Sequence, residues 1–511
     1  MKLNYKRTFF VGFAFFLICA FWQAYDSAIP LILTNKFGLS QTASGVIMAL
    51  DNILALFMLP LFGAISDRCC SKLGKRTPFI LVGTLVAAIA FVALSFADAA
   101  QLRNIRPAAA IDDPAALALI YESEGEETLM TPEGEYFVLS ERFTEEEFCA
   151  IRSETDGAVN AEYTDYVVPA RQAYAAGVTH AAPTTLIVFI VLLLVVLFAM
   201  AIFRSPAVAL MPDVTIKPLR SKANAVINLM GSAGGVLVLV LGMVFKTGSA
   251  ANALMPYTLY FCVIAAIMLL ALAVFLLRVR EPRFVAEMHA ESARYGIDNG
   301  EEDESGDRKL GKAERRSMVF LLASIVLWFF GYNAVTSKYS VYATNILNKD
   351  FNFTMIIAQA AAILAYVPVG IVASKVGRKR TILGGIVMLG AAFCMACFMR
   401  ENSPTWLMNV MFALAGIGWA TINVNSFPMV VEMCRGGDIG RYTGIYYTAS
   451  MAAQTVTPMI SGYLMDKMGM TVLFPYATVF VALAFVTMLF VFHGDSKPIA
   501  KRGLEAMDVE D

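Results

Sequence analysis

Long apolar runs alternate with short polar segments along almost the whole chain. A helix needs about 20 apolar residues to cross the hydrocarbon layer of a bilayer, and about twelve runs approach that length. The pattern therefore predicts an all-α membrane protein with twelve transmembrane helices. The runs lie near residues 9–33, 42–64, 79–98, 184–206, 222–246, 257–278, 317–344, 353–373, 380–399, 405–430, 442–465 and 472–492.

Basic residues cluster in alternate loops between these runs. Arg68, Lys75 and Arg76 follow the second run, and further lysines and arginines follow the fourth, eighth and tenth. The positive-inside rule places such loops in the cytoplasm, so both chain ends are predicted to be cytoplasmic. With short polar tails and no organellar targeting segment, we expect a multi-pass protein of a bacterial-type plasma (inner) membrane.

The composition agrees with a membrane protein and excludes other classes. Hydrophobic residues make up 58% of the chain and charged residues 16%, whereas soluble proteins carry about a quarter charged residues. Lys and Arg number 40 against 41 Asp and Glu, so no basic field exists for binding nucleic acid. The eight cysteines lie mostly in apolar runs or near basic helix ends, which predicts packing roles rather than a metal site. No cofactor is expected.

Two longer polar segments divide the chain. Residues 99–183 form an acidic insert on the outer side, and residues 280–316 form a charged cytoplasmic connector. The composition of the connector, with its acidic centre at 298–307, argues against a packed domain. The remaining predicted parts are an N-terminal half (1–98 and 184–279), a C-terminal half (317–493) and a cytoplasmic tail (494–511).

The acidic insert shows two signs of local structure. Residues 128–130 and 136–139 flank a Pro132-Glu133-Gly134 turn, which is typical of a β-hairpin. Thr144 followed by Glu147 has the spacing of a helix capping box. The alternative is a solvated acidic loop without a function.

The two halves repeat each other when the chain is split at the connector. Residues 25–28 align with residues 332–335, so that Asp26 pairs with Asn333. Further pairs are Pro60 with Pro368 and Asp51 with Gln359. Six helices repeated in parallel predict two pseudo-symmetric halves with a central cleft, which is where membrane transporters commonly bind their substrate.

One motif between the second and third runs identifies a family. Gly63-Ala64-Ile65-Ser66-Asp67-Arg68, followed by Gly74-Lys75-Arg76, resembles the signature of the major facilitator superfamily. Asp67 lies at a helix end, where it can pair with arginines. The alternative is that these charges only set the topology. We interpret as gating residues Gly63, Asp67, Arg68, Gly74, Arg76, Asp213, Arg220, Glu432 and Arg441.

Two stretches favour one branch of that superfamily. Pro78-Phe79-Ile80 after the motif, and residues 205–213 followed by 220–225, are similar to the sucrose-transporter and glycoside-pentoside-hexuronide:cation symporter branch. The resemblance implies an acidic proton site within the fourth helix, but residues 186–203 contain no acid. Arg204 also comes earlier than the arginine of the family, which falls at the position of Val208. The proton site of the branch therefore cannot be carried over.

Four ionisable residues fall inside the apolar runs, where each is costly and therefore a candidate for function. They are Asp26, Asp51, Arg204 and Lys338. The melibiose-type part of the resemblance implies coupling carboxylates on the second helix, so Asp51 is the leading coupling candidate, with Arg204 as its counter-charge. Asp26 in the first helix could accept sugar hydroxyls or a proton. The alternatives are a static hydrogen bond from Asp51 to Asn52 or Arg204, and a structural Asp26–Lys338 ion pair.

Sugar sites combine aromatic faces with amides that bind hydroxyls, and the runs supply both. A lone aromatic residue in a membrane helix more often packs, and Asn or Gln often bridges helices. The candidate substrate residues are Trp22, Gln23, Tyr25, Asp26, Tyr332, Asn333, Lys338, Gln359, Trp419, Asn423, Asn425 and Gln454.

The combined features favour a monomeric secondary active transporter for a small molecule. We expect a sugar:proton symporter of a mono- or disaccharide that works by alternating access in the lipid bilayer, with Na⁺ as the alternative coupling ion. Other possibilities are a drug or amphiphile antiporter and a membrane sensor that reads a ligand through the insert. An enzyme is not expected, because no nucleophile, base and orienter motif appears in the polar segments.

Overall fold

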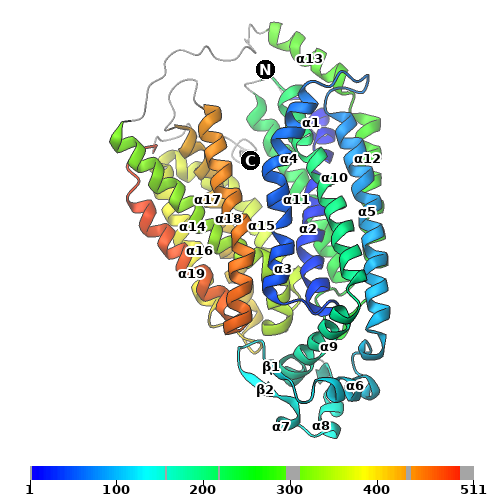
Figure 1. Ribbon diagram of the computed structural model, residues 1–511. Helices are drawn as coiled ribbons and strands as arrows, with labels where there is room; N and C mark the ends of the chain where they lie inside the picture. Colours follow the sequence, from blue (N-terminus) through cyan, green and yellow to red (C-terminus); the bar gives the residue numbers. More distant parts are fainter. Residues whose placement is uncertain (1–2, 156–157, 217–218, 295–310, 433–438, 495–511) are drawn as a thin grey trace.

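The computed structural model describes residues 3–155, 158–216, 219–294, 311–432 and 439–494. Its main body is a bundle of long helices in two halves (Figure 1). The N-terminal half contains α1 (Tyr5–Val11), α2 (Phe13–Asn35), α3 (Gln41–Met48), α4 (Leu50–Asp67), α5 (Thr77–Asn104), α10 (Thr184–Val214), α11 (Arg220–Val244) and α12 (Thr258–Arg278). The C-terminal half contains α14 (Lys312–Tyr342), α15 (Phe351–Val376), α16 (Arg378–Ala396), α17 (Thr405–Glu432), α18 (Ile439–Met468) and α19 (Leu473–Leu489).

Each of the twelve apolar runs corresponds to a helical segment, with α1–α2 and α3–α4 each forming one span. Ten helices in the described part of the chain are long and apolar enough to cross a membrane. The predicted end of the fourth span near residue 206 is wrong, because α10 continues to Val214 with Pro206 and Pro212 inside it. Membrane helices tolerate such prolines because neighbouring groups satisfy the freed backbone.

Each half has its own hydrophobic core. In the N-terminal half the core centres on Phe21 and on Phe91, whose ring stacks on Phe261 at 4.1 Å between centroids. In the C-terminal half it centres on the fully buried Trp328. Because lipid offers no hydrophobic drive between helices, this close packing holds each half together.

The insert is a folded unit and not a solvated loop. Its hairpin and capping box are confirmed: β1 (Thr128–Met130) pairs with β2 (Tyr136–Val138), and Thr144 and Glu147 cap α8 reciprocally. A buried apolar cluster that includes Leu117, Phe137 and Phe148 forms its core. The other elements are η1 (Arg106–Ala108), α6 (Pro114–Glu124), α7 (Leu139–Arg142), α8 (Glu145–Ala150), β3 (Glu154–Thr155), β4 (Ala158–Val159), η2 (Tyr163–Val167) and α9 (Val168–Ala181).

The charged connector contains a helix that its composition did not indicate. This helix, α13 (Glu281–Arg294), packs Met288 against Ile216 and Leu219 of the N-terminal half. The acidic centre at 298–307 lies outside the described residues. We call the face of the bundle that carries α13 the α13 face, and the opposite one the insert face (Figure 1).

The two halves meet at the insert face and diverge toward the α13 face (Figure 1). At the insert face, the Asp466 carboxylate of α18 accepts hydrogen bonds from the backbone N–H groups of Gln41 and Thr42, both at 2.7 Å. Gly45 also packs directly against the backbone of Pro458, the close approach that small residues allow between membrane helices. These contacts hold the two halves together at the insert face, so this state is closed there.

Candidate functional site

A polar cavity lies between the two halves, midway along the bundle. It consists of two adjoining pockets of about 580 Å³ and 180 Å³ that share Trp22, Asp26, Arg204 and Thr336. Helices α2, α3, α4, α10 and α11 line one side, and helices α14 to α18 line the other. The cavity therefore draws its side chains from both repeats, as the sequence alignment of the halves predicts.

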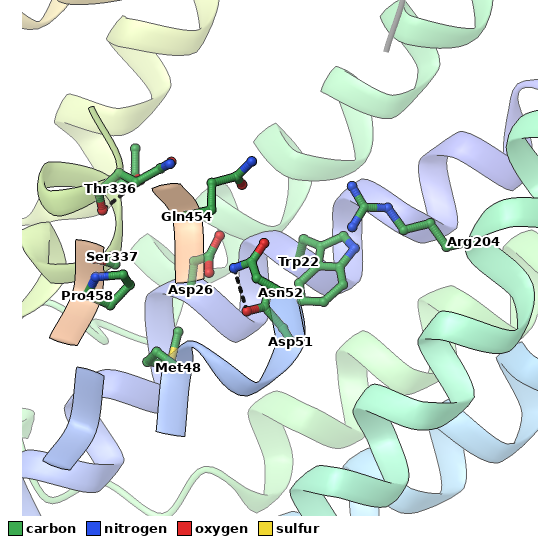
Figure 2. Close-up of a pocket in the computed structure, with 11 residues that line it drawn as sticks. Trp22, Asp26, Met48, Asp51, Asn52, Arg204, Thr336, Ser337, Gln454 and Pro458 are labelled. Atoms are coloured by element: carbon green, nitrogen blue, oxygen red, sulfur yellow. Dashed lines mark hydrogen bonds between the residues drawn. The ribbon is translucent and has the colours of Figure 1, made fainter. Parts of the chain in front are cut away.

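Two carboxylates face this cavity from neighbouring helices. Asp26 comes from α2 and Asp51 from α4, and Figure 2 shows them on either side of Asn52. The Asn52 amide donates a hydrogen bond to Asp51 at 2.7 Å. The alternative in which Asp51 makes a static hydrogen bond to Asn52 is therefore observed in this state. Both carboxylates are accessible from the same small pocket, where a cation or a proton can reach them.

The positive charge nearest to these carboxylates is Arg204 of α10. Its guanidinium carbon lies 5.5 Å from the centre of the Trp22 ring, a cation–π distance. It makes no ion pair within 4 Å with Asp26 or Asp51 in the described structure. Arg204 therefore shares the cavity with both carboxylates as a nearby charge and not as a bonded partner.

Lys338 does not belong to the cavity, although the sequence placed it among the substrate residues. It is completely buried, and its ammonium donates to the backbone carbonyl oxygen of Gln41 at 2.6 Å. The alternative Asp26–Lys338 ion pair is therefore wrong for this state. Lys338 instead helps to join the halves at the insert face, because it lies on α14 and Gln41 lies on α3.

An aromatic pair forms one wall of the larger pocket. The rings of Tyr332 on α14 and Trp419 on α17 stack at 3.6 Å between centroids with an interplanar angle of 1°. Such a flat surface suits the apolar face of a ring-shaped ligand. The two residues come from separate helices of the C-terminal half, so the sequence could name them but could not show that they stack.

Three buried polar atoms of the cavity wall have no hydrogen-bond partner among the described residues. They are the Trp22 indole nitrogen, the Asn333 amide nitrogen and the Gln359 amide oxygen. Buried polar atoms are nearly always satisfied by protein, water or ligand. Two donors and one acceptor without a partner therefore belong to residues that line this cavity, which makes it the candidate place for a polar ligand.

The remaining predicted substrate residues divide into two groups. Gln23, Asn423 and Gln454 line the cavity, and the Gln359 amide donates to Gln23 across the two halves at 2.8 Å. Asn425 instead donates to the Thr421 carbonyl oxygen within α17, and neither pocket includes it.

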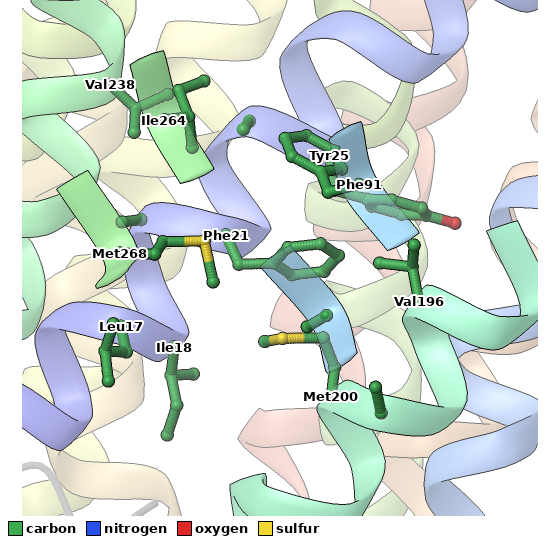
Figure 3. Close-up of a cluster of buried hydrophobic side chains, with 14 of the residues drawn as sticks. Leu17, Ile18, Phe21, Tyr25, Phe91, Val196, Met200, Val238, Ile264 and Met268 are labelled. Atoms are coloured by element: carbon green, nitrogen blue, oxygen red, sulfur yellow. The ribbon is translucent and has the colours of Figure 1, made fainter. Parts of the chain in front are cut away.

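Tyr25 also does not line the cavity. Its ring stacks on Phe21 inside the N-terminal core, and Figure 3 shows it beside Phe91. Its hydroxyl donates to the Met48 carbonyl oxygen at 3.4 Å. The alternative role, packing by a lone aromatic residue, is the one observed for Tyr25.

Several cavity residues were missing from the sequence prediction. Asn52, Thr336, Ser337, Met48 and Pro458 all line the smaller pocket. The signal for Thr336 and Ser337 was available, because they follow Asn333 by three and four positions and thus share its helix face. No local signal marks Pro458, which reaches the pocket through the packing of α18 on α3.

The predicted gating motif forms a charge cluster at the α13 face. The Arg76 guanidinium binds Asp67 and lies 2.8 Å from Asp213, and all three residues belong to the N-terminal half. Arg68 is exposed and makes no ion pair with the described residues, so Arg76 and not Arg68 is the partner of Asp67. Gly63 packs close to the Ser205 hydroxyl, as expected for a helix contact. The side chains of Arg220, Glu432 and Arg441 lie outside the described residues.

Glu281 is the main residue of this cluster that sequence reasoning missed. Its buried carboxylate accepts hydrogen bonds from the backbone N–H groups of Lys75 at 2.6 Å and Thr77 at 2.8 Å. It therefore caps the N-terminus of α5, where negative charge is favourable. Gly74, with φ of +114°, allows the carboxylate to approach the backbone. The position of Glu281 after the sixth span gave no indication of this role.

Comparison with known proteins agrees with this arrangement. The family model described as Major Facilitator Superfamily matches residues 11–109, 172–359 and 341–507. The sucrose transport protein SUC3 of Arabidopsis thaliana is 40% identical over 67 residues, which cover 13% of this chain and 11% of that protein. The MFS-type transporter ppzB of Metarhizium rileyi is 24% identical over 123 residues, which cover 24% of this chain and 25% of that protein. The matches thus span a quarter or less of these curated relatives.

Solved structures resemble nearly the whole chain. A crystal structure of a D-xylose-proton symporter has a TM-score of 0.56 at 16% identity and covers 95% of this chain and 98% of that chain. A crystal structure of the nucleoside transporter NupG has a TM-score of 0.53 at 13% identity and covers 96% and 99%. At these identities the likeness establishes the fold.

Proposed function

This chain belongs to the major facilitator superfamily, and we propose that it is a sugar:proton symporter that works by alternating access. As a member of that superfamily it is a multi-pass membrane transporter for a small molecule and not an enzyme. The substrate class and the coupling ion are the proposed parts. The observation that carries them is one cavity that holds a stacked aromatic wall, unpartnered amide and indole groups, and two carboxylates.

The chemistry of this wall fits a sugar better than an apolar compound. The Tyr332–Trp419 face matches the C–H face of a pyranose ring. Hydroxyl groups both donate and accept, so they can satisfy the Trp22 and Asn333 donors together with the Gln359 acceptor. An amphiphilic drug would leave these groups unpaired, which disfavours binding.

Charge counting in the cavity supports coupling to one cation. The charged residues that line the two pockets are Asp26, Asp51 and Arg204, so two negative charges face one positive charge. One proton on either carboxylate makes the net charge of this set zero. A set without net charge costs less free energy to enclose in a low-dielectric environment while the halves move. Asp51 is our leading coupling residue and Asp26 its partner, with Na⁺ as the alternative cation.

The orientation of the molecule follows from its basic loops. Arg68, Lys75 and Arg76 lie at the α13 face, and so do Lys375 and Arg378 at the junction of α15 and α16. In the sequence, basic residues also follow the fourth and tenth spans. The positive-inside rule places this face and both termini in the cytoplasm, and the insert outside the plasma (inner) membrane. In this orientation the state closed at the insert face is the inward-facing one.

Counterflow of radiolabelled sugars in proteoliposomes tests the substrate class. We expect exchange of a mono- or disaccharide, with an apparent affinity that falls about tenfold in Trp419→Ala, because the stacking surface is lost. Trp406→Ala is the matched control, since Trp406 lies on the same helix but is 66% exposed. A panel in which nucleosides or amphiphiles exchange and no sugar does would overturn the substrate assignment.

A further inference from the structure

The insert is firmly attached to the N-terminal half. The Gln172 amide of α9 donates to Asn35 at the end of α2 at 2.9 Å, and Gln101 of α5 donates to Thr179 of α9 at 2.9 Å. Gly38 packs directly against the α9 backbone at Ala176. Together with its own apolar core, these contacts make the insert move with the N-terminal half as one body.

The tip of the β1–β2 hairpin nevertheless contacts the C-terminal half. The Pro132 carbonyl oxygen accepts a hydrogen bond from the Met470 N–H at 2.6 Å. The Glu133 carboxylate forms an ion pair with Arg400 at 3.1 Å. Met470 lies between α18 and α19, and Arg400 lies between α16 and α17, so one turn of the insert reaches two loops of the other half. Figure 1 shows this hairpin beneath the ends of the C-terminal helices.

Two glycines allow this contact to be made through the backbone. Gly134 and Gly469 have φ angles of +99° and +87°, a region that favours glycine. A Cβ on Gly469 would lie 2.5 Å from the Gly134 nitrogen, which leaves no room for a side chain. The turn of the insert and the loop of the C-terminal half therefore fit together at van der Waals distance.

A third contact joins η2 of the insert to the loop after α14. The Thr164 hydroxyl donates to the Asn348 side-chain oxygen at 3.1 Å. Asn348 has a φ of +49°, so it terminates η5 (Ala343–Leu347) in the left-handed conformation. The insert thus touches all three loops that connect the helices of the C-terminal half at this face.

We propose that the insert is a latch that stabilises the state closed at the insert face. The proposal rests on the alternating access described above: when that face opens, the halves separate there, and the hairpin, held by the N-terminal half, must leave the C-terminal loops. Its contacts exist in one state and are lost in the other, so their free energy shifts the equilibrium between the states. Weakening the latch raises the population that is open at the insert face.

Thiol labelling of a buried gate residue measures this population. Ser44 of α3 is completely buried at the closed face, and its hydroxyl has no partner among the described residues. In Ser44→Cys, a membrane-impermeant maleimide added from the insert side reacts when this face opens. Adding Glu133→Arg should raise the labelling rate about two- to fivefold, the range for an exposed ion pair. The charge swap Glu133→Arg with Arg400→Glu should restore the slow rate.

The matched control is Glu126→Arg. Glu126 is exposed on the same insert, and its side chain makes no hydrogen bond or ion pair with any described residue, so its reversal should leave the labelling rate unchanged. Equal rates in Glu133→Arg and Glu126→Arg, or no return to the slow rate in the charge swap, would overturn the latch. The labelling needs no substrate, so failure of the sugar assignment leaves this result intact.

Discussion

The two faces of the bundle use their polar residues differently. At the α13 face, Arg76 pairs with Asp67 and Asp213, and all three residues belong to the N-terminal half. At the insert face, polar groups cross between the halves, as in the contacts of Asp466 with Gln41 and of Glu133 with Arg400. The same kinds of residues therefore join helices of one half at the α13 face and join the two halves to each other at the insert face.

The largest expected effect comes from fixing the contact between the halves at the insert face. We predict that a short bifunctional thiol reagent between Glu133→Cys and Arg400→Cys abolishes sugar exchange, because the hairpin can then no longer leave the C-terminal loops. A cleavable reagent should restore exchange on reduction. The same reagent between Asn35→Cys and Gln172→Cys is the control, since both residues move with the N-terminal half. Exchange that continues in the first pair would show that the faces do not alternate here.

Contacts within a half should instead control stability. Lys36 and Asp98 are completely buried in the N-terminal half and form an ion pair at 2.5 Å. Lys36→Met leaves the Asp98 charge buried without its partner, which costs about 3–5 kcal/mol of unfolding free energy. Thermal unfolding of the purified protein should show the loss, and Lys36→Met with Asp98→Leu should recover most of it. If Lys36→Met alone were as stable as Lys36→Met with Asp98→Leu, the ion pair would not contribute to stability.

A smaller effect, on state and not on stability, is expected at Asp466. Asp466→Ala removes the acceptor for the N-terminus of α3 and should raise the labelling rate of Ser44→Cys about tenfold, since hydrogen bonds to charged groups contribute about 1.5–3 kcal/mol. The melting temperature should change little, because each half keeps its own core. A large fall in melting temperature with an unchanged labelling rate would contradict this prediction, because Asp466 would then stabilise the fold and not the closed state.

The smallest effect concerns pH at the insert face. Burial, followed by the charges of Glu133, Glu401 and Glu135, raises the pKa of Asp165 from 3.8 to about 6, while Arg142 opposes this shift. Because Glu401 belongs to the C-terminal half, part of the shift is lost when the latch releases. A carboxyl pKa that is higher in the latched state than in the released state makes latching more favourable when Asp165 is protonated, and this advantage is lost as pH rises through about 6.

Ser44→Cys should therefore be labelled more slowly at pH 5 than at pH 7, by about twofold after allowance for the partial exposure of Asp165. Asp165→Asn should remove this difference once the intrinsic pH dependence of the reagent is corrected with a free thiol. A pH response that survives in Asp165→Asn would assign it to another group.

The sequence could predict the helices and the approximate set of cavity residues, but not their geometry. Hydrophobic periodicity and length are local properties, so the runs located every span. Asp26 and Asp51 were correctly predicted to lie in the cavity, because an ionisable residue in an apolar run is costly and therefore marks a functional place. Lys338 was predicted by the same argument but joins the halves at the insert face. Packing between helices decides which way each helix faces, and the sequence pattern does not show this.

The residues that the sequence missed act at long range along the chain. Glu281 caps a helix that begins about two hundred residues earlier, and Asp466 caps α3 from the other half. The insert hairpin was predicted from its turn residues, whereas its docking on Arg400 depends on the folded arrangement of both halves. No local pattern records such contacts.

The most direct test of the account separates proton coupling from substrate exchange in proteoliposomes. Sugar accumulation driven by an imposed pH gradient and sugar counterflow without a gradient are measured for the wild type and for Asp51→Asn. We predict that the wild type performs both, and that Asp51→Asn keeps counterflow but loses accumulation, because its cavity is permanently neutral at that position. Accumulation that persists in Asp51→Asn would contradict the account.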